Sequence, residues 1–171
     1  MKIYFASHAT SLDNEAGLAS GWKDVELSEV GKKQAKELGE RFQDILIDLI
    51  CCSDLKRAVD TVNMAFGEKL PIIVDKRLRE TNYGDLDGMP KEELDVVRPR
   101  EVFPNGESDE QAVERVQSFY EELKEKYADK TILVVGHRAT QWGLDVMTGK
   151  KTLEECVAEK FQWQSYWEYD V

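Results

Sequence analysis

The chain has 171 residues, 42% of them hydrophobic and 33% charged, and its formal net charge is −11. This length suits one domain, residues 1–171, that can bury a core without disulfides or a structural metal. The acidic balance makes nucleic acid and anionic membranes poor partners through bulk electrostatics, although a few arginines could still bind a small anion at close range. No apolar run approaches membrane-spanning length, and the N-terminus lacks a signal-peptide layout.

The cysteine content indicates a reducing compartment. Cys51, Cys52 and Cys156 show no metal-ligand spacing, and adjacent cysteines such as Cys51 and Cys52 make a poor disulfide pair. We therefore expect three reduced core cysteines and a cytoplasmic protein.

The first half of the chain alternates strands and helices. Ile3–Phe5 is a short apolar, β-favouring run that breaks into small and hydroxylated residues around His8, and a polar loop follows at 11–26. Ser28 is a plausible helix N-cap, and the apolar spacing that continues to Leu46 predicts a helix of about five turns. The next elements are expected in this order: a buried strand at 48–52, a helix beginning within 53–57, a strand at 70–74, a loop at 77–88 and a short helix from Pro90 to near Val97.

The second half continues the alternation. Two prolines and a glycine predict a surface excursion at 98–107, and Ser108 with Gln111 forms a capping box at the start of a long helix. A strand at 131–135, a helix at 139–147 and a final aromatic strand at 161–167 complete the pattern, with the tail aromatics expected mainly in the core. The fold class is therefore α/β, a three-layer α/β/α sandwich around a mostly parallel sheet.

Two histidines, His8 and His137, are the only ones in the chain, and they lie 129 positions apart. Each follows an apolar strand that ends in small residues. Open α/β folds bind ligands at the carboxyl edge of the sheet, so both side chains should lie at that edge. Arg57, near a predicted helix start, also suggests an anion site, because the helix dipole disfavours an unpaired positive charge there.

Six motifs in order give the chain a family resemblance. They are Ser7-His8-Ala9 with Ser11 and Asn14; Gly21, Asp24, Leu27-Ser28, Gly31 and Gln34-Ala35; Ser53-Asp54-Leu55-Lys56-Arg57-Ala58 with Thr61; Leu78-Arg79-Glu80 with Gly84 and Gly88; Pro104-Asn105-Gly106-Glu107-Ser108; and Gly136-His137. In this arrangement the chain resembles the histidine phosphatase superfamily, which has the phosphoglycerate mutase-like fold. The resemblance spans nearly the whole chain.

The resemblance implies a phosphoryl-transfer site that works without a metal or another cofactor. His8 would be the nucleophile that forms phosphohistidine, since a neutral imidazole is competent near pH 7. Glu80 would be the general acid and base, and Arg57 and His137 would bind the phosphoryl oxygens. The expected partner is a small phosphorylated substrate, and the oligomeric state stays open.

One position departs from the family pattern. The family has an arginine before the nucleophile, where this chain has Ser7, and losing such a contact costs about 10²–10³ in rate by analogy with single oxyanion donors. Arg138, where the family usually has glycine, is a hypothetical replacement, and Arg77 and Arg79 are other sources of charge. Ser7, Ser11, Asn14 and Arg138 are the expected substrate-binding residues.

Three functions remain open at this point. The first is phosphomonoester hydrolysis, the second is a phosphoglycerate mutase-type transfer, and the third is a degenerate, non-catalytic phosphate-binding domain, suggested by Ser7. Glu80 argues against the third, because a carboxylate beside a bound dianion weakens binding unless it takes part in proton transfer. The sequence does not identify the substrate.

Overall fold

A five-stranded sheet forms the centre of the computed structural model, which describes residues 1–98 and 102–171. The strands are β1 (Lys2–Ser7), β2 (Leu49–Cys52), β3 (Ile72–Val74), β4 (Thr131–Gly136) and β5 (Trp167–Asp170). Their order across the sheet is β3-β2-β4-β1-β5, and β5 alone in this sheet runs antiparallel to its neighbour, β1. This confirms the mostly parallel sheet.

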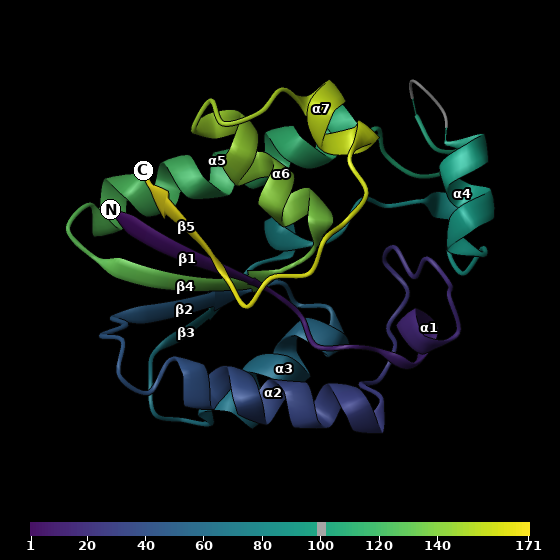
Figure 1. Ribbon diagram of the computed structural model, residues 1–171. Helices are drawn as coiled ribbons and strands as arrows, with labels where there is room; N and C mark the ends of the chain where they lie inside the picture. Colours follow the sequence, from purple (N-terminus) through teal and green to yellow (C-terminus); the bar gives the residue numbers. More distant parts are fainter. Residues whose placement is uncertain (99–101) are drawn as a thin grey trace.

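Helices cover both faces of the sheet (Figure 1). The α-helices are α1 (Leu12–Glu15), α2 (Glu29–Arg41), α3 (Lys56–Phe66), α4 (Lys91–Val97), α5 (Asp109–Tyr127), α6 (Arg138–Met147) and α7 (Leu153–Ala158). Two 3₁₀ turns, η1 (Lys76–Leu78) and η2 (Gly84–Leu86), lie in the loop before α4. Helices α2 and α3 pack on one face, and α5 and α6 pack on the other. The α/β/α sandwich predicted from the sequence is therefore confirmed.

The core is split by the sheet because side chains of a strand alternate between its faces. In β1, Tyr4 packs with Phe42 and Val62 on the α2–α3 side, whereas Phe5 packs with Val116 on the α5 side. Cys51 and Cys52 belong to opposite faces of β2, and all three cysteines are buried and free, as expected. None of the helices in the described residues combines the length and apolar character needed to cross a membrane.

Several element boundaries were predicted wrongly in the first half. Helix α2 ends at Arg41, and residues 42–45 form a turn, so Leu46 is 92% exposed although it continues the helical spacing. The predicted loop at 11–26 contains the one-turn helix α1, which Ser11 caps.

The second half needs three further corrections. Helix α7 was not predicted, although Thr152 and Glu155 form a capping box at its start. The last strand is Trp167–Asp170 and not 161–167, because the main-chain partners of β1 begin only at Trp167. In the segment predicted as a surface excursion, residues 99–101 lie outside the described ranges, but Phe103 is only 1% exposed and packs against Tyr83.

Candidate active site

The carboxyl ends of β1 and β4 bring the two histidines together. These strands are adjacent and parallel, with Ser7 opposite Gly136, so His8 and His137 leave the sheet at the same edge. Their ring centroids lie 5.0 Å apart. The predicted convergence of these two side chains is therefore confirmed, while their chemical roles remain predictions.

The backbone after β1 is held by four contacts from other elements. The His8 N–H donates to Gly136 O (2.9 Å), the Ala9 N–H donates to Thr61 Oγ1 (3.0 Å), and the Thr10 N–H donates to Gln34 Oε1 (2.9 Å). Helix α2 approaches this loop so closely that a Cβ on Gly31 would lie 2.0 Å from Thr10 O. Any side chain at position 31 would clash with this backbone oxygen, which gives a structural reason for the glycine of that motif.

The His8 ring has a defined tautomer. Its Nδ1 lies 2.7 Å from Ala9 O, and because a carbonyl oxygen only accepts, Nδ1 carries the proton. Nε2 therefore keeps its lone pair, and Arg57 Nε donates to it across 3.3 Å. Burial and the nearby Arg57 charge lower the pKa of His8 to about 3. His8 is thus a neutral imidazole with its nucleophilic nitrogen next to a guanidinium.

Arg57 is a buried cation that contacts no carboxylate of residues 1–98 and 102–171. The side chain is 2% exposed, and its Nη atoms donate to Gly21 O (2.8 Å) and Lys23 O (3.1 Å). Burial lowers the pKa of Arg57. A guanidinium in this environment gains free energy when an anion arrives, because it recovers part of the solvation that it lost on folding.

His137 offers a second nitrogen to the same space. Its Nε2 lies 2.6 Å from Ser53 Oγ, and its Nδ1 is buried and has no hydrogen-bond partner in the part of the chain that the structure describes. Burial, followed by the charge of Arg57, lowers the pKa of His137 well below its usual value. Buried polar atoms in folded proteins are nearly always paired, so an unpaired Nδ1 beside His8 indicates a position for a ligand atom.

Glu80 is fixed at the start of α6. Its Oε1 accepts the Thr81 and Ala139 N–H groups, both at 3.0 Å, and its Oε2 accepts the Arg138 N–H at 3.2 Å. The Glu80 carbonyl accepts from Trp22 Nε1 at 2.7 Å. The carboxylate is therefore oriented by backbone donors from two segments, in the same cavity as His8.

The four predicted catalytic residues line one cavity of about 320 Å³. Five basic residues and two acidic ones line it: Arg41, Arg57, Lys91, Arg98, Arg138, Glu80 and Asp95. The chain as a whole carries a charge of −11, so this excess of cations is local. A cavity of this charge and size suits a small anionic ligand. Within the described ranges, no three His, Cys, Asp or Glu side chains gather as a metal site would require.

Comparison with known proteins agrees with this geometry. The family model "Histidine phosphatase superfamily (branch 1)" matches residues 3–144. The chain belongs to this superfamily.

Relatives within the superfamily include both phosphatases and mutases. The chain is 35% identical to "Uncharacterized phosphatase PhoE" of Bacillus subtilis over 70% of this chain and 62% of that protein. It is 31% identical to a 2,3-bisphosphoglycerate-dependent phosphoglycerate mutase of Lachnoclostridium phytofermentans over 80% of this chain and 73% of the mutase. The structure of Bacillus stearothermophilus YhfR has the same fold, with a TM-score of 0.87, 23% identity, and coverage of 99% of this chain and 91% of that one.

Of the three predicted substrate-binding residues near His8, two line the cavity and the third caps helix α1. Ser7 and Asn14 line the cavity. Ser11 is fully buried, and its hydroxyl accepts the Asn14 N–H as the N-cap of α1 (3.2 Å). A contact between Ser11 and a phosphate would therefore have to compete with this cap.

The arginines considered as replacements for the missing family arginine make other contacts. Arg138 Nη2 donates to Glu159 O (2.6 Å) and to Cys156 O (3.4 Å), at the end of α7. The guanidinium of Arg79 pairs with Asp54, and that of Arg77 pairs with Asp75 and Glu122. Each guanidinium is thus directed to a partner other than His8, and the replacement hypothesis loses its geometric support.

Three contributions to the site were missed from the sequence. Ser53 contacts His137, Thr61 holds the loop after β1, and Trp22 holds the Glu80 carbonyl. Ser53 and Thr61 belong to a motif that was recognised, but a motif does not show which atoms its side chains contact. Phe161 and Trp163 also line the cavity, although they were expected mainly in the core.

Proposed function

We propose that this protein hydrolyses phosphomonoesters through a phosphohistidine on His8. The observation that carries the proposal is the neutral His8 ring, whose unprotonated Nε2 contacts Arg57 and whose ring lies next to that of His137, where Nδ1 has no partner among the described residues. The relation to phosphatases such as PhoE supports the reaction class. The proposed steps use no metal or cofactor.

In the first step, His8 Nε2 attacks the phosphorus of the ester. The P–N bond forms while the P–O bond to the leaving alcohol breaks, and Glu80 supplies the proton that the alkoxide needs. Arg57 binds the equatorial oxygens, where charge concentrates in phosphoryl transfer. The neutral His137 ring carries its proton on Nδ1 when its Nε2 accepts the hydrogen bond of the Ser53 hydroxyl. In this tautomer Nδ1 donates to a phosphoryl oxygen, so no net charge on His137 is required.

In the second step, Glu80 accepts a proton from water as the water oxygen attacks the phosphorus. The P–N bond breaks, and its electron pair returns to His8 Nε2. The products are inorganic phosphate and the alcohol, and the enzyme is restored to its starting protonation state. Glu80 suits both directions of proton transfer because backbone donors fix its carboxylate inside the cavity.

Trapping the intermediate tests the proposal. A ³²P-labelled phosphomonoester should label the wild-type protein with the acid-labile, base-stable behaviour of phosphohistidine, and His8→Ala should take up no label. Glu80→Gln should still be labelled by an activated aryl ester, because such a leaving group needs no acid, but the label should turn over slowly. Equal labelling of His8→Ala would overturn the proposal.

Product analysis separates hydrolysis from mutase activity. With 3-phosphoglycerate, a mutase would produce 2-phosphoglycerate, whereas the proposed reaction releases inorganic phosphate without isomerisation. The cytoplasmic location also remains a proposal, supported by the three free cysteines.

A further inference from the structure

The cavity lining includes apolar side chains in addition to the reacting groups. Beyond the cluster of His8, Arg57, His137 and Glu80, its lining includes Leu18, Leu38, Leu94, Phe161 and Trp163. The two aromatic residues come from the segment between α7 and β5, which returns to the sheet in Figure 1 (yellow). The lining therefore joins an anion-binding group of side chains to an apolar wall.

The aromatic side chains of this wall are open to solvent. Trp163 is 59% exposed and Phe161 is 37% exposed. Large aromatic side chains that line a cavity and remain exposed offer apolar area that a ligand can bury. The leucines at 38 and 94, in contrast, are buried within the protein and have little area to offer.

Contacts from other elements hold both rings, although their segment has no regular secondary structure. The Arg41 guanidinium of α2 lies 5.3 Å from the Trp163 ring centroid, and the Phe161 ring lies 6.3 Å from that of Trp167. A cation over one face of the indole leaves the other face available for stacking. The wall is therefore partly pre-organised.

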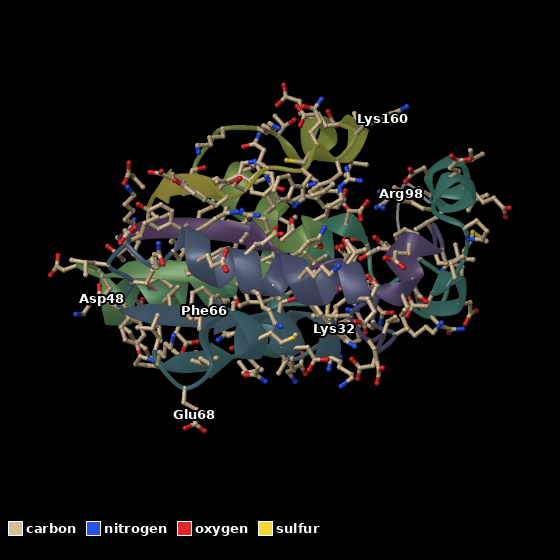
Figure 2. The ribbon with its side chains drawn as sticks, turned by 60° about the horizontal axis from the view of Figure 1, so that its bottom comes forward. Lys32, Asp48, Phe66, Glu68, Arg98 and Lys160 are labelled. Atoms are coloured by element: carbon tan, nitrogen blue, oxygen red, sulfur yellow. The ribbon has the colours of Figure 1, made fainter. Side chains whose placement is uncertain are left out.

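Two of the remaining cations of the cavity, Arg98 and Arg138, are bound to partners elsewhere in the protein. Arg98 pairs with Asp109 at 2.6 Å and lies beside α4, at the end of the molecule opposite Asp48 (Figure 2). Arg138 donates to the end of α7, as described above. Lys91 is exposed and lies four residues from Asp95, and both residues line the cavity.

From this distribution we infer that the substrate is a phosphomonoester whose leaving alcohol carries an aromatic or similarly flat apolar group, which stacks against Trp163 and Phe161. The inference rests on the proposed function and names the substrate class of the same site. It predicts that apolar area on the leaving alcohol, and not a carboxylate such as that of phosphoglycerate, raises the reactivity of the ester.

The test compares esters that differ in apolar area but not in leaving-group reactivity. Benzyl phosphate and ethyl phosphate have leaving alcohols of similar acidity, and 3-phosphoglycerate adds a carboxylate. We expect kcat/KM for benzyl phosphate to exceed that for each of the other two by about tenfold or more, the scale of discrimination by an apolar pocket. Trp163→Ala should lower the benzyl-to-ethyl ratio about fivefold or more, mainly through KM, with Phe161→Ala acting in the same direction.

The controls separate this inference from the proposed function. Leu46→Ala removes another highly exposed apolar side chain, one that is not part of the cavity lining, and should leave the ratio unchanged. Trp163→Phe should retain most of the preference, because it keeps an aromatic face. Hydrolysis of all three esters with no benzyl preference, or an equal loss for all three in Trp163→Ala, would overturn the inference alone. Failure to hydrolyse any of them, together with the absence of His8 labelling, would overturn the proposed function.

Discussion

Replacing Arg57 with glutamine should raise the pKa of His8 by about one unit. The pKa of His8 is lowered from 6.5 to about 3, with burial as the larger cause and the Arg57 charge as the second. Arg57 is therefore the smaller of the two lowering causes, and because a charge within about 4–6 Å shifts a pKa by about 1–3 units, we expect its loss to act at the lower end of that range. A cation about 4 Å away could shift the pKa by more at low dielectric, but His8 is partly open to solvent, which screens the interaction. Burial persists in the variant, so the pKa should stay below 6.5.

NMR titration of the imidazole resonances measures this shift directly. The chain has two histidines, so His137→Gln identifies the His8 signals. Lys56→Gln is a matched control, because it removes a positive charge from the same turn of α3 while leaving the contact between Arg57 and His8 in place. A wild-type His8 that titrates near 6.5, or a pKa that Arg57→Gln leaves unchanged, would refute the electrostatic reasoning.

The lowered pKa values of the two histidines also determine how the free energy of unfolding changes as the pH falls. A histidine whose pKa is lowered by folding contributes stability that is complete above about 6.5 and is lost as the pH falls from 6.5 toward 3, because the unfolded chain then binds more protons. His137 acts in the same direction. Arg57→Gln should make the free energy of unfolding fall less steeply between pH 6.5 and 4. Urea unfolding at several pH values checks this slope.

Three further substitutions probe the site. Ser7→Arg should raise kcat/KM for a phosphomonoester about tenfold or more by supplying a cation at the cavity wall, and an unchanged rate would show that this position lies outside the reaction. Ser53→Ala should lower kcat about tenfold with little change in KM, since it leaves His137 Nε2 unpaired, and Ser53→Thr should restore part of the rate. Arg138→Ala should keep kcat within about threefold of the wild type while lowering thermal stability, because its guanidinium holds the end of α7; a hundredfold loss of kcat would reinstate it as the replacement cation.

The arrangement of the sheet and the approach of the two histidines were predictable because both depend on short-range rules. Apolar runs such as Thr131–Val135 specify buried strands, and adjacent parallel strands carry whatever follows them to the same edge. The position of His137 beside His8 needs no further information. Helix starts were similarly accessible where a side chain caps the first turn, as Ser28 and Ser108 do.

The boundaries of α2 and of the last strand were predicted wrongly because tertiary contacts outweigh the local pattern of apolar residues there. The spacing of Ile45 and Leu46 continues that of α2, but the chain turns at Phe42 to enter β2, and Leu46 ends in solvent. The alternation in the tail resembles a strand, yet pairing with β1 starts at Trp167 and leaves Trp163 beside the cavity. Neither result could be derived without knowing which element lies opposite.

The direction of long side chains was the least predictable feature of the site, and Arg138 shows why. Its position next to His137 was correctly taken to place it at the cavity, and its backbone N–H does bind Glu80. Its guanidinium, however, is several bonds away and reaches carbonyls at the end of α7, where the helix dipole and unpaired acceptors favour a cation. Because α7 was itself not predicted, those acceptors could not be taken into account.

Arg57 is the opposite case: its side chain is buried, its Nη atoms bind the Gly21 and Lys23 carbonyls, and its Nε remains directed at His8. The charge available for an incoming phosphoryl group therefore depends on which guanidinium has a nitrogen directed at His8, and in the described residues this favours Arg57 over Arg138.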